Sequence, residues 1–292
     1  MTAAATLRRK RQPGSAEAER IRWVEARGRS FAFTLEPGLP LLEAVRRGFA
    51  AEGFVSGTLE LGALALNPFA YVIPSLSETP DFAAYYSETF RPAGITRLID
   101  GAMTFGSRDG APFFHTHALW READGRLMGG HILPSDETVV AEAAEVHAFG
   151  LSGAQFDGTP CRETNFKLFE PIPAAATGAA TDRRCFALRL RPNIDLFEAL
   201  EAFCREHGLG AARIRGGVGS TIEARFDDRP PAPNFATEVY IRDGRIAPDA
   251  DGGLRAQISA ALVDYTGATA EGRLTRGDNP VLMTFELVLV DE

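Results

Sequence analysis

The stretch FFHTHALWREADGRLMGGHIL, residues 113–133, sets the organisation of the first half of this chain. Two apolar segments flank an Ala-Asp-Gly turn signal at residues 123–125, which predicts a β-hairpin. The stretch contains three of the five histidines in the sequence. Residues two apart in a strand share a face, so His115 and His117 should point in the same direction.

The length of the turn decides whether the third histidine joins them. A three-residue loop with a left-handed Gly125 would pair Glu122 with Arg126. His117 would then lie opposite His131, with Cβ atoms about 4.5–5.5 Å apart. A two-residue Asp-Gly loop would shift the register by one and send His131 to the other face. The first alternative brings three imidazoles to one point, and the second does not.

Three neutral imidazoles on one face form a ligand set for a divalent transition metal, most simply zinc. Such a set leaves a fourth position for water or a ligand, as in catalytic rather than structural zinc sites. Gly129 and Gly130 lack Cβ atoms and would let the backbone, or a bound group, approach the ion. The alternative interpretation is a hairpin whose histidines only pack and form hydrogen bonds.

The pattern His-Thr-His, Asp-Gly and Gly-Gly-His resembles the PPC domain (plants and prokaryotes conserved), and the resemblance covers about residues 29–170. It implies a fold with a mostly antiparallel sheet, trimeric assembly, and a metal held by these histidines in some prokaryotic members. In plants the domain follows AT-hook motifs in nuclear DNA-binding proteins, whereas in bacteria and archaea it usually stands alone. The resemblance implies no single activity.

An internal repeat indicates that the chain carries two such units. Residues 29–45, RSFAFTLEPGLPLLEAV, align with residues 184–200, RCFALRLRPNIDLFEAL, with eight of 17 positions identical. Each copy predicts a strand, a turn with proline and an amphipathic helix, over about 41–51 and 196–207. Asp195 is the expected N-cap of the second helix, and Gly53 and Gly208 are expected just past the helix ends.

We therefore predict an α+β protein of two tandem PPC-like domains, each a mostly antiparallel sheet with one or two packed helices. Residues 1–28 form a basic and polar extension, for which a helix up to about Ala26 is one interpretation. Residues 29–170 form the domain with the histidine site, 171–181 a linker, and 182–292 a degenerate second domain. In that domain, segment 237–246 is expected to keep the strand and Asp-Gly turn, and residues 247–249 replace Gly-Gly-His.

Two further polar residues are candidates for the site. The alternation of segment 138–149 puts Glu145 and His147 on one face, and Glu145 is the candidate general base or outer partner of a ligating histidine. A solvated strand edge is the alternative. Lys167, one of two lysines in the sequence, could bind a carboxylate beside the metal or be an ordinary surface residue.

Composition narrows the function classes. The 292 residues are 45% hydrophobic and 24% charged, which is typical of globular domains. No apolar run reaches the ~18 residues of a membrane helix, and the basic cluster at 8–11 precedes no apolar signal core. Three scattered cysteines favour a reducing, cytoplasmic setting. The net charge of −8 argues against a broad nucleic-acid footprint.

Three functional hypotheses follow. The first is a metal-dependent enzyme, of hydrolase or lyase type, that acts on a small polar substrate. The second is a DNA-binding or regulatory protein, although the Arg-Gly-Arg-Pro core of an AT-hook is absent and Arg27-Gly28-Arg29 is followed by serine. The third is a non-catalytic ligand sensor that uses the same pocket. We favour the first, in a homo-oligomeric protein with no membrane partner.

Overall fold

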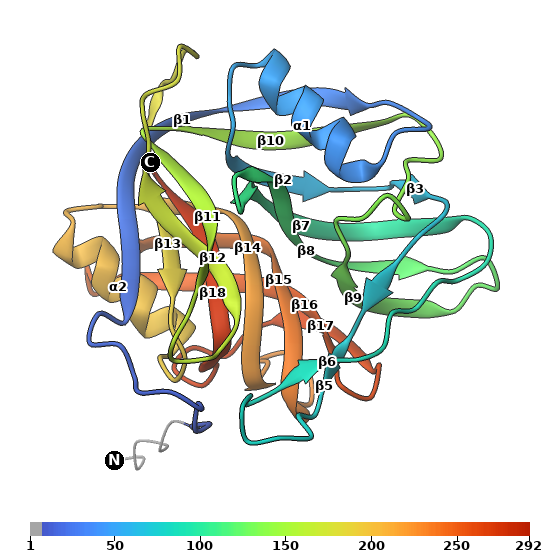
Figure 1. Cartoon of the computed structure of the whole chain (residues 1–292). Coiled ribbons are helices and arrows are strands. Elements are labelled where there is room, and N and C mark those ends of the chain that lie inside the picture. Colours follow the sequence, from blue (N-terminus) through green and yellow to red (C-terminus); the bar gives the residue numbers. More distant parts are fainter. Residues whose placement is uncertain (1–7) are drawn as a thin grey trace.

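The computed structural model describes residues 8–292 as a sheet-rich molecule with two helices (Figure 1). The first half of the chain contains the elements β1 (Ile21–Leu35), α1 (Leu41–Ala51), β2 (Gly57–Leu61), β3 (Ala65–Leu66), β4 (Tyr71–Val72), β5 (Pro74–Ser75), β6 (Tyr85–Tyr86), β7 (Thr96–Arg108), β8 (Ala111–Arg121), β9 (Leu127–Ile132), β10 (Ala144–Ser152), β11 (Ala154–Pro160) and β12 (Lys167–Pro173). The second half contains β13 (Arg183–Leu190), α2 (Leu196–Glu206), β14 (Ala212–Ala224), β15 (Ala232–Pro248), β16 (Leu254–Asp264), β17 (Thr269–Arg273) and β18 (Val281–Asp291).

The two halves repeat one strand order. In the first copy the order across the sheet is β1-β10-β2-β7-β8-β9, and in the second it is β13-β18-β14-β15-β16-β17. Each copy also places its helix directly after its first strand. The pairings in both copies are antiparallel, and β11 adds one parallel contact to β7. The internal repeat in the sequence therefore reflects two copies of one fold.

The helices begin and end where the repeat predicted. The side chain of Asp195 accepts hydrogen bonds from the backbone N–H groups of Phe197 and Glu198, at 2.9 and 3.0 Å, and so caps α2. Gly53 and Gly208 follow the two helices with φ of +78° and +69°. This left-handed conformation suits glycine and ends both helices at equivalent positions.

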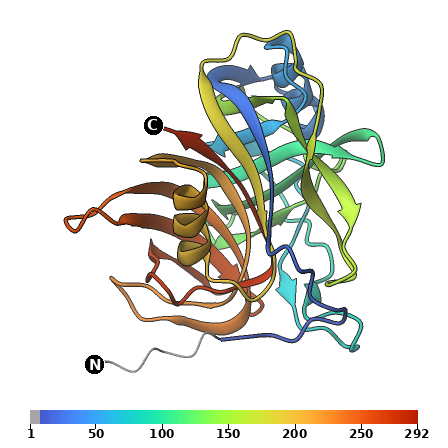
Figure 2. The same ribbon diagram turned by 90° about the vertical axis from the view of Figure 1, so that its left-hand side faces the viewer.

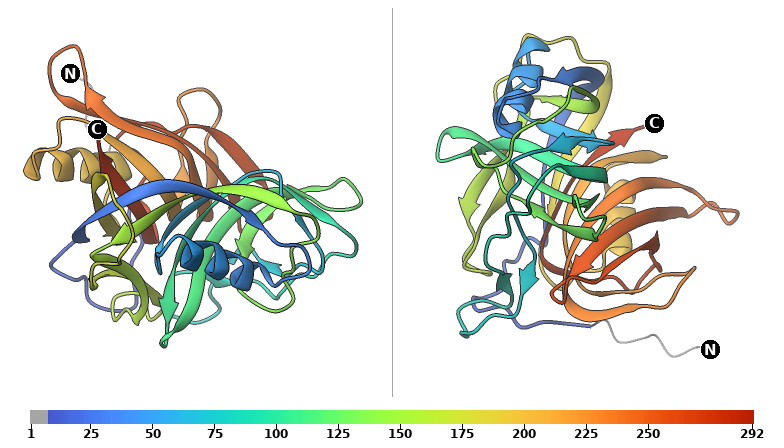
Figure 3. Two further views of the ribbon diagram at one scale, coloured as in Figure 1. Left: turned by 90° about the horizontal axis from the view of Figure 1, so that it is seen from above. Right: turned by 90° about the vertical axis from the view of Figure 1, so that its right-hand side faces the viewer.

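The two sheets pack against each other through the faces that carry no helix. α1 covers one face of the first sheet and α2 covers one face of the second, each over its own apolar core. β14 and β15 contact β7, and β16 contacts β8 and β9. Figures 2 and 3 show the strands of the two copies on opposite sides of the molecule. A small apolar cluster marks the contact between the sheets and consists of Ala102, Leu119, Val218, Tyr240 and Ala261.

β1 joins the copies into one continuous sheet. Residues 27–35 of β1 pair with β10 of the first copy, and residues 21–28 pair with β13 of the second. The helical interpretation of the stretch up to Ala26 is therefore wrong, because residues 21–26 are strand. At the other boundary, β12 continues to Pro173, so the first residues of the expected linker also belong to a strand.

The hairpin of the second copy lies further along the chain than the sequence indicated. β15 runs without a turn through Asp243 and Gly244, so the expected Asp-Gly turn in segment 237–246 is wrong. The equivalent turn follows Asp264, whose backbone N–H donates to the carbonyl of Ala268 at 3.0 Å. Gly267, with φ of +82°, completes it. The Asp243-Gly244 dipeptide was misinterpreted because a dipeptide alone does not distinguish a turn from a bulged strand.

The corrected register shows what replaces the histidines in the second copy. Ser259 pairs with Arg273 there, as His117 pairs with His131 in the first copy. Gln257 stands two residues before Ser259 on the same strand and corresponds to His115. The second copy thus carries none of the three imidazoles at these positions.

Gly129 and Gly130 of β9 lie in close contact with neighbouring strands. A Cβ on Gly129 would meet Leu119 at 2.5 Å and Val263 of the second copy at 3.3 Å. A Cβ on Gly130 would lie 2.5 Å from the carbonyl oxygen of Val72. Protein atoms thus lie close beside both glycines, and the lack of a Cβ allows β9 to pack tightly against its neighbours.

We expect Gly130→Ala to lower the free energy of unfolding by about 1–3 kcal/mol, because the added methyl group would force the backbone of β4 away from β9. Gly62→Ala is the matched control, since nothing lies within 4 Å of its Cβ position. Urea unfolding followed by tryptophan fluorescence measures both. Equal stability of the two variants would contradict the packing role of Gly130.

Candidate metal centre

The hairpin has the three-residue loop that brings the histidines together. The backbone N–H of Glu122 donates to the carbonyl of Arg126 at 3.0 Å, and Gly125 has φ of +86°. His117 on β8 consequently pairs with His131 on β9. The predicted register is confirmed.

The three imidazoles gather on the face of the first sheet that meets the second copy. One ring nitrogen from each of His115, His117 and His131 lies within 4.8 Å of the other two. His117 and His131 are buried, whereas the side chain of His115 is 12% exposed. The cluster therefore has one partly open side.

Hydrogen bonds fix the direction in which two of the rings point. A carbonyl oxygen can only accept, so His117 donates its Nδ1–H to Val239 at 3.0 Å and keeps a lone pair on Nε2. Nδ1 of His115 lies 2.8 Å from a carboxylate oxygen of Glu286. The Nε2 atoms of His115 and His117 face each other at 3.2 Å. Because Nε2 of His117 carries a lone pair, it can accept a hydrogen bond from an Nε2–H of His115 or share a cation with that atom.

Burial keeps two of the imidazoles in the form that binds metals. Desolvation, and secondarily the charge of His115, lowers the pKa of both His117 and His131 well below the ordinary value of 6.5. Both rings are therefore neutral at physiological pH. Nδ1 of His131 is buried without a hydrogen-bond partner among the described residues.

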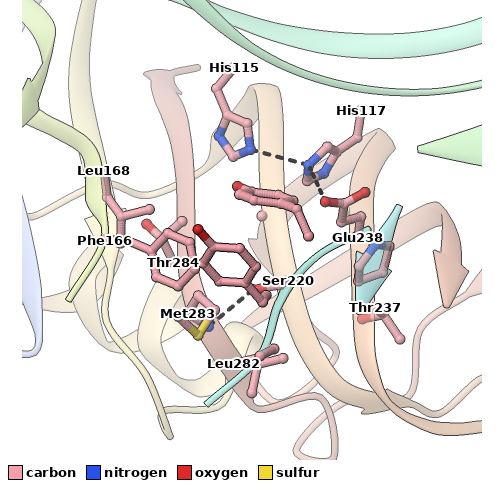
Figure 4. A pocket seen from close by; sticks show the side chains of 15 residues that line it. His115, His117, Phe166, Leu168, Ser220, Thr237, Glu238, Leu282, Met283 and Thr284 are labelled. Atoms are coloured by element: carbon pink, nitrogen blue, oxygen red, sulfur yellow. Dashed lines mark hydrogen bonds and ion pairs between the residues drawn. The ribbon is translucent and has the colours of Figure 1, made fainter. Parts of the chain in front are cut away.

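Two carboxylates from the second copy complete the surroundings. Glu286 projects from β18 and Glu238 from β15, and both side chains are almost fully buried. An oxygen of Glu238 lies 3.9 Å from Nε2 of His117, and Figure 4 shows it beside this ring. Within residues 8–292, the second oxygen of each carboxylate has no hydrogen-bond partner. Burial raises the pKa of Glu238 well above its usual range.

Sequence reasoning missed both carboxylates, although each leaves a signal. Glu286 is the one charged residue in the apolar run VLMTFELVLV, and Glu238 interrupts the strand segment ATEVYI. A charge in an otherwise apolar strand is costly unless it has a partner. The sequence could not show that this partner is the histidine cluster, because that requires knowing how the two sheets face each other.

Glu145, the base suggested by the sequence, does not join the cluster. It is exposed on β10, and β2 and β7 separate that strand from β8. Neighbouring strands lie about 4.8 Å apart, so three steps across the sheet amount to roughly 14 Å. The alternation that placed Glu145 and His147 on one face was read correctly, but it concerns a different part of the sheet.

Two cavities adjoin the histidines. The smaller one, about 50 Å³, lies between His117 and the second copy and is lined there by Ser220, Glu238 and Thr284 (Figure 4). The larger one, about 410 Å³, adjoins His115 and His131 and reaches Arg108 and Lys167. Both are bordered by Tyr85 and Tyr86 of β6. The cluster is therefore accessible to a small molecule.

Comparison with known protein families gives a match in the second half of the chain. Residues 178–291 match the Plants and Prokaryotes Conserved (PCC) domain. This part of the chain belongs to that family, and the first half repeats its strand order. The match falls on the copy without the histidines, whereas the histidine pattern resembles the family over residues 29–170. No curated protein matches the chain.

Among solved structures, a plant- and prokaryote-conserved protein of Pyrococcus horikoshii is 21% identical, with a TM-score of 0.40 over 52% of this chain and 97% of its own. A metal-containing protein of Archaeoglobus fulgidus is 20% identical, with a TM-score of 0.38 over 49% of this chain and 94% of its own. A protein of Ralstonia eutropha, described as a candidate DNA-binding protein, is 13% identical, with a TM-score of 0.36 over 49% and 90%.

The helices within residues 8–292 are too short or too polar to cross a membrane.

We expect the metal-free protein to lose stability relative to His131→Gln as the pH falls from 7 to 5. The unfolded state takes up a proton near pH 6.5 that the folded state refuses, so the parent loses up to about 1.4 kcal/mol per pH unit for this one group. The raised pKa of Glu238 acts in the opposite direction, but it is common to both proteins and largely cancels in the difference.

Urea unfolding at several pH values in the presence of a chelator measures this difference. The exposed His147, changed to Gln, is the control for loss of a histidine elsewhere on the sheet. If the free energies of unfolding of the parent and of His131→Gln change equally with pH, then His131 is not held neutral by burial.

Proposed function

We propose that the chain binds a divalent transition metal, most simply zinc, through His115, His117 and His131. The carrying observation is the pair of facing Nε2 atoms at 3.2 Å, with the third imidazole beside them. Two nitrogens bound tetrahedrally at 2.0–2.1 Å from zinc lie roughly 3.3–3.4 Å apart. The pair is thus already spaced for a shared ion.

The groups behind the ligands support this proposal. Metal-bound histidines usually donate their other ring N–H to a carboxylate or a carbonyl, which orients the ring and raises its basicity. Glu286 occupies this place behind His115, and the carbonyl of Val239 occupies it behind His117. Both partners belong to the second copy, so the second domain would hold the ligands of the first in position.

The proposed chemistry is hydrolysis or carbon–carbon bond cleavage of a small polar molecule. Three protein ligands leave one coordination position open, where a metal can polarise a carbonyl or lower the pKa of a bound water. Glu238 replaces Glu145 as the candidate general base or acid, because its carboxylate lies beside the ligands and has a free oxygen. Burial raises the pKa of Glu238, which favours the protonated form that can donate a proton.

Purified, untagged protein should contain close to one equivalent of zinc or a related metal, and His117→Ala should lose it. Removal of one of three ligands leaves too few donors to retain the ion against a weak chelator. Inductively coupled plasma mass spectrometry measures the content. His147→Ala, on the exposed face of β10, is the matched control and should keep the metal.

A parent protein that contains no metal, and takes up none when zinc, manganese, iron or cobalt is supplied, would exclude this function. Retention of metal by His117→Ala would place the ion elsewhere in the chain.

Glu238→Gln should keep the metal and lose about 10²–10⁴-fold in rate if Glu238 transfers protons in the reaction. The rate is measured on a panel of aryl esters, amides and oxo acids, with metal content determined on the same samples. Glu145→Gln is the matched control and should be as active as the parent. A metal-loaded parent that turns over no member of the panel would favour a ligand sensor, and a fully active Glu238→Gln would remove Glu238 from the mechanism.

A further inference from the structure

The larger cavity is lined by a cation, Arg108, as well as by the histidines. Arg108, the last residue of β7, is half-buried, and its side chain lies over Gly158 of β11. A Cβ on Gly158 would meet Cγ of Arg108 at 2.9 Å, so the glycine leaves room for the stem of the arginine. The guanidinium carbon lies 5.1 Å from the centre of the Phe113 ring. These contacts hold the guanidinium at the cavity that adjoins His115 and His131.

Arg108 differs from its neighbours in having no anionic partner. No ion pair within residues 8–292 involves Arg108, whereas Lys167, which lines the same cavity, pairs with Asp109 at 2.5 Å. A half-buried guanidinium retains donors in a fixed fork that fits a carboxylate in bidentate fashion. The position is therefore suited to bind an anion that enters the cavity.

Arg108 and the candidate metal site lie along the same face of β8. Phe113 and His115 lie on the same face of β8, two residues apart, which corresponds to roughly 6.6–7 Å. Arg108 stacks on the first of these residues, and the second is a candidate ligand. A molecule held by both would therefore need an oxygen group at each of two separate points of its frame.

The walls of the cavity favour a flat molecule. Aromatic rings contribute much of its lining, and such rings stack well on planar groups. The rings belong to Tyr85, Tyr86, Phe113, Phe166 and Phe169. Glu286 also lines the cavity and would repel an anion, but its carboxylate contacts His115 and would be compensated by the metal behind it.

We propose that this cavity binds a planar, aromatic or unsaturated carboxylic acid with a second oxygen group at its far end. The carboxylate pairs with Arg108, and the second oxygen reaches the open metal position. This inference rests on the proposed metal site and adds to it the class of ligand. It assigns to Arg108 the role of selecting acids over neutral molecules.

The test uses the full chain loaded with zinc and three probes: benzene-1,4-dicarboxylate, benzoate, and the neutral 1,4-benzenedimethanol. Isothermal titration calorimetry should rank the dicarboxylate first, because only this probe carries both a carboxylate and a distal oxygen. Arg108→Gln should weaken its binding about tenfold or more, and Arg108→Lys, which keeps the charge without the fork, should weaken it less.

Arg213→Gln, at an exposed arginine of the second copy, is the matched control and should bind like the parent. Metal content is measured on every sample, so that the two proposals are tested separately. A metal-loaded parent that binds the dicarboxylate no better than metal-loaded Arg108→Gln overturns this inference alone. A parent that takes up no metal overturns the metal site and the two-point ligand together. If the parent binds the neutral 1,4-benzenedimethanol as tightly as the dicarboxylate, the role of Arg108 is also overturned.

Discussion

Each of the two sheets carries a helix on one face and has only its other face left for a partner, and the whole molecule follows from this constraint. Apolar side chains on the free faces would be exposed in a single copy, and the cluster around Leu119 and Tyr240 buries them. The alternation of side chains along β8 then determines which residues face the core and which face the second copy. Trp120 enters the core beneath α1, whereas His115, His117 and Leu119 face the second copy.

The duplication has divided the roles of the two copies around this contact. The first copy presents three imidazoles, and in the second Ser259 and Arg273 occupy the positions of the paired histidines. The second copy instead contributes Glu238, Glu286 and the carbonyl of Val239 to the same cluster. The second copy lacks the imidazoles yet keeps the same strand order, because a fold positions a site without prescribing its chemistry.

Local patterns in the sequence correctly predicted the features that depend on residues close together in the chain. The repeat located both helices, and the turn signal with Gly125 fixed the register that unites His117 and His131. Glu145 was misplaced because strand alternation gives the face of a residue but not the position of its strand within a sheet. Glu238 and Glu286 were missed for a related reason: their partners lie on another sheet, over a hundred positions away in the sequence. The Asp-Gly of residues 243–244 shows that turn chemistry yields to long-range pairing when a strand can continue through it.

The shared strand β1 also bears on the order in which the chain can fold. A ribosome releases β1 first, yet its C-terminal part pairs with β10 and its N-terminal part pairs with β13. Both halves of the strand therefore have unpaired edges until well over a hundred further residues have been synthesised. Pairings this distant in sequence are slow to form, and an exposed edge can template association with other chains. Because β1 pairs with strands of both copies, a cut between the copies would leave β13 without its neighbour on one side.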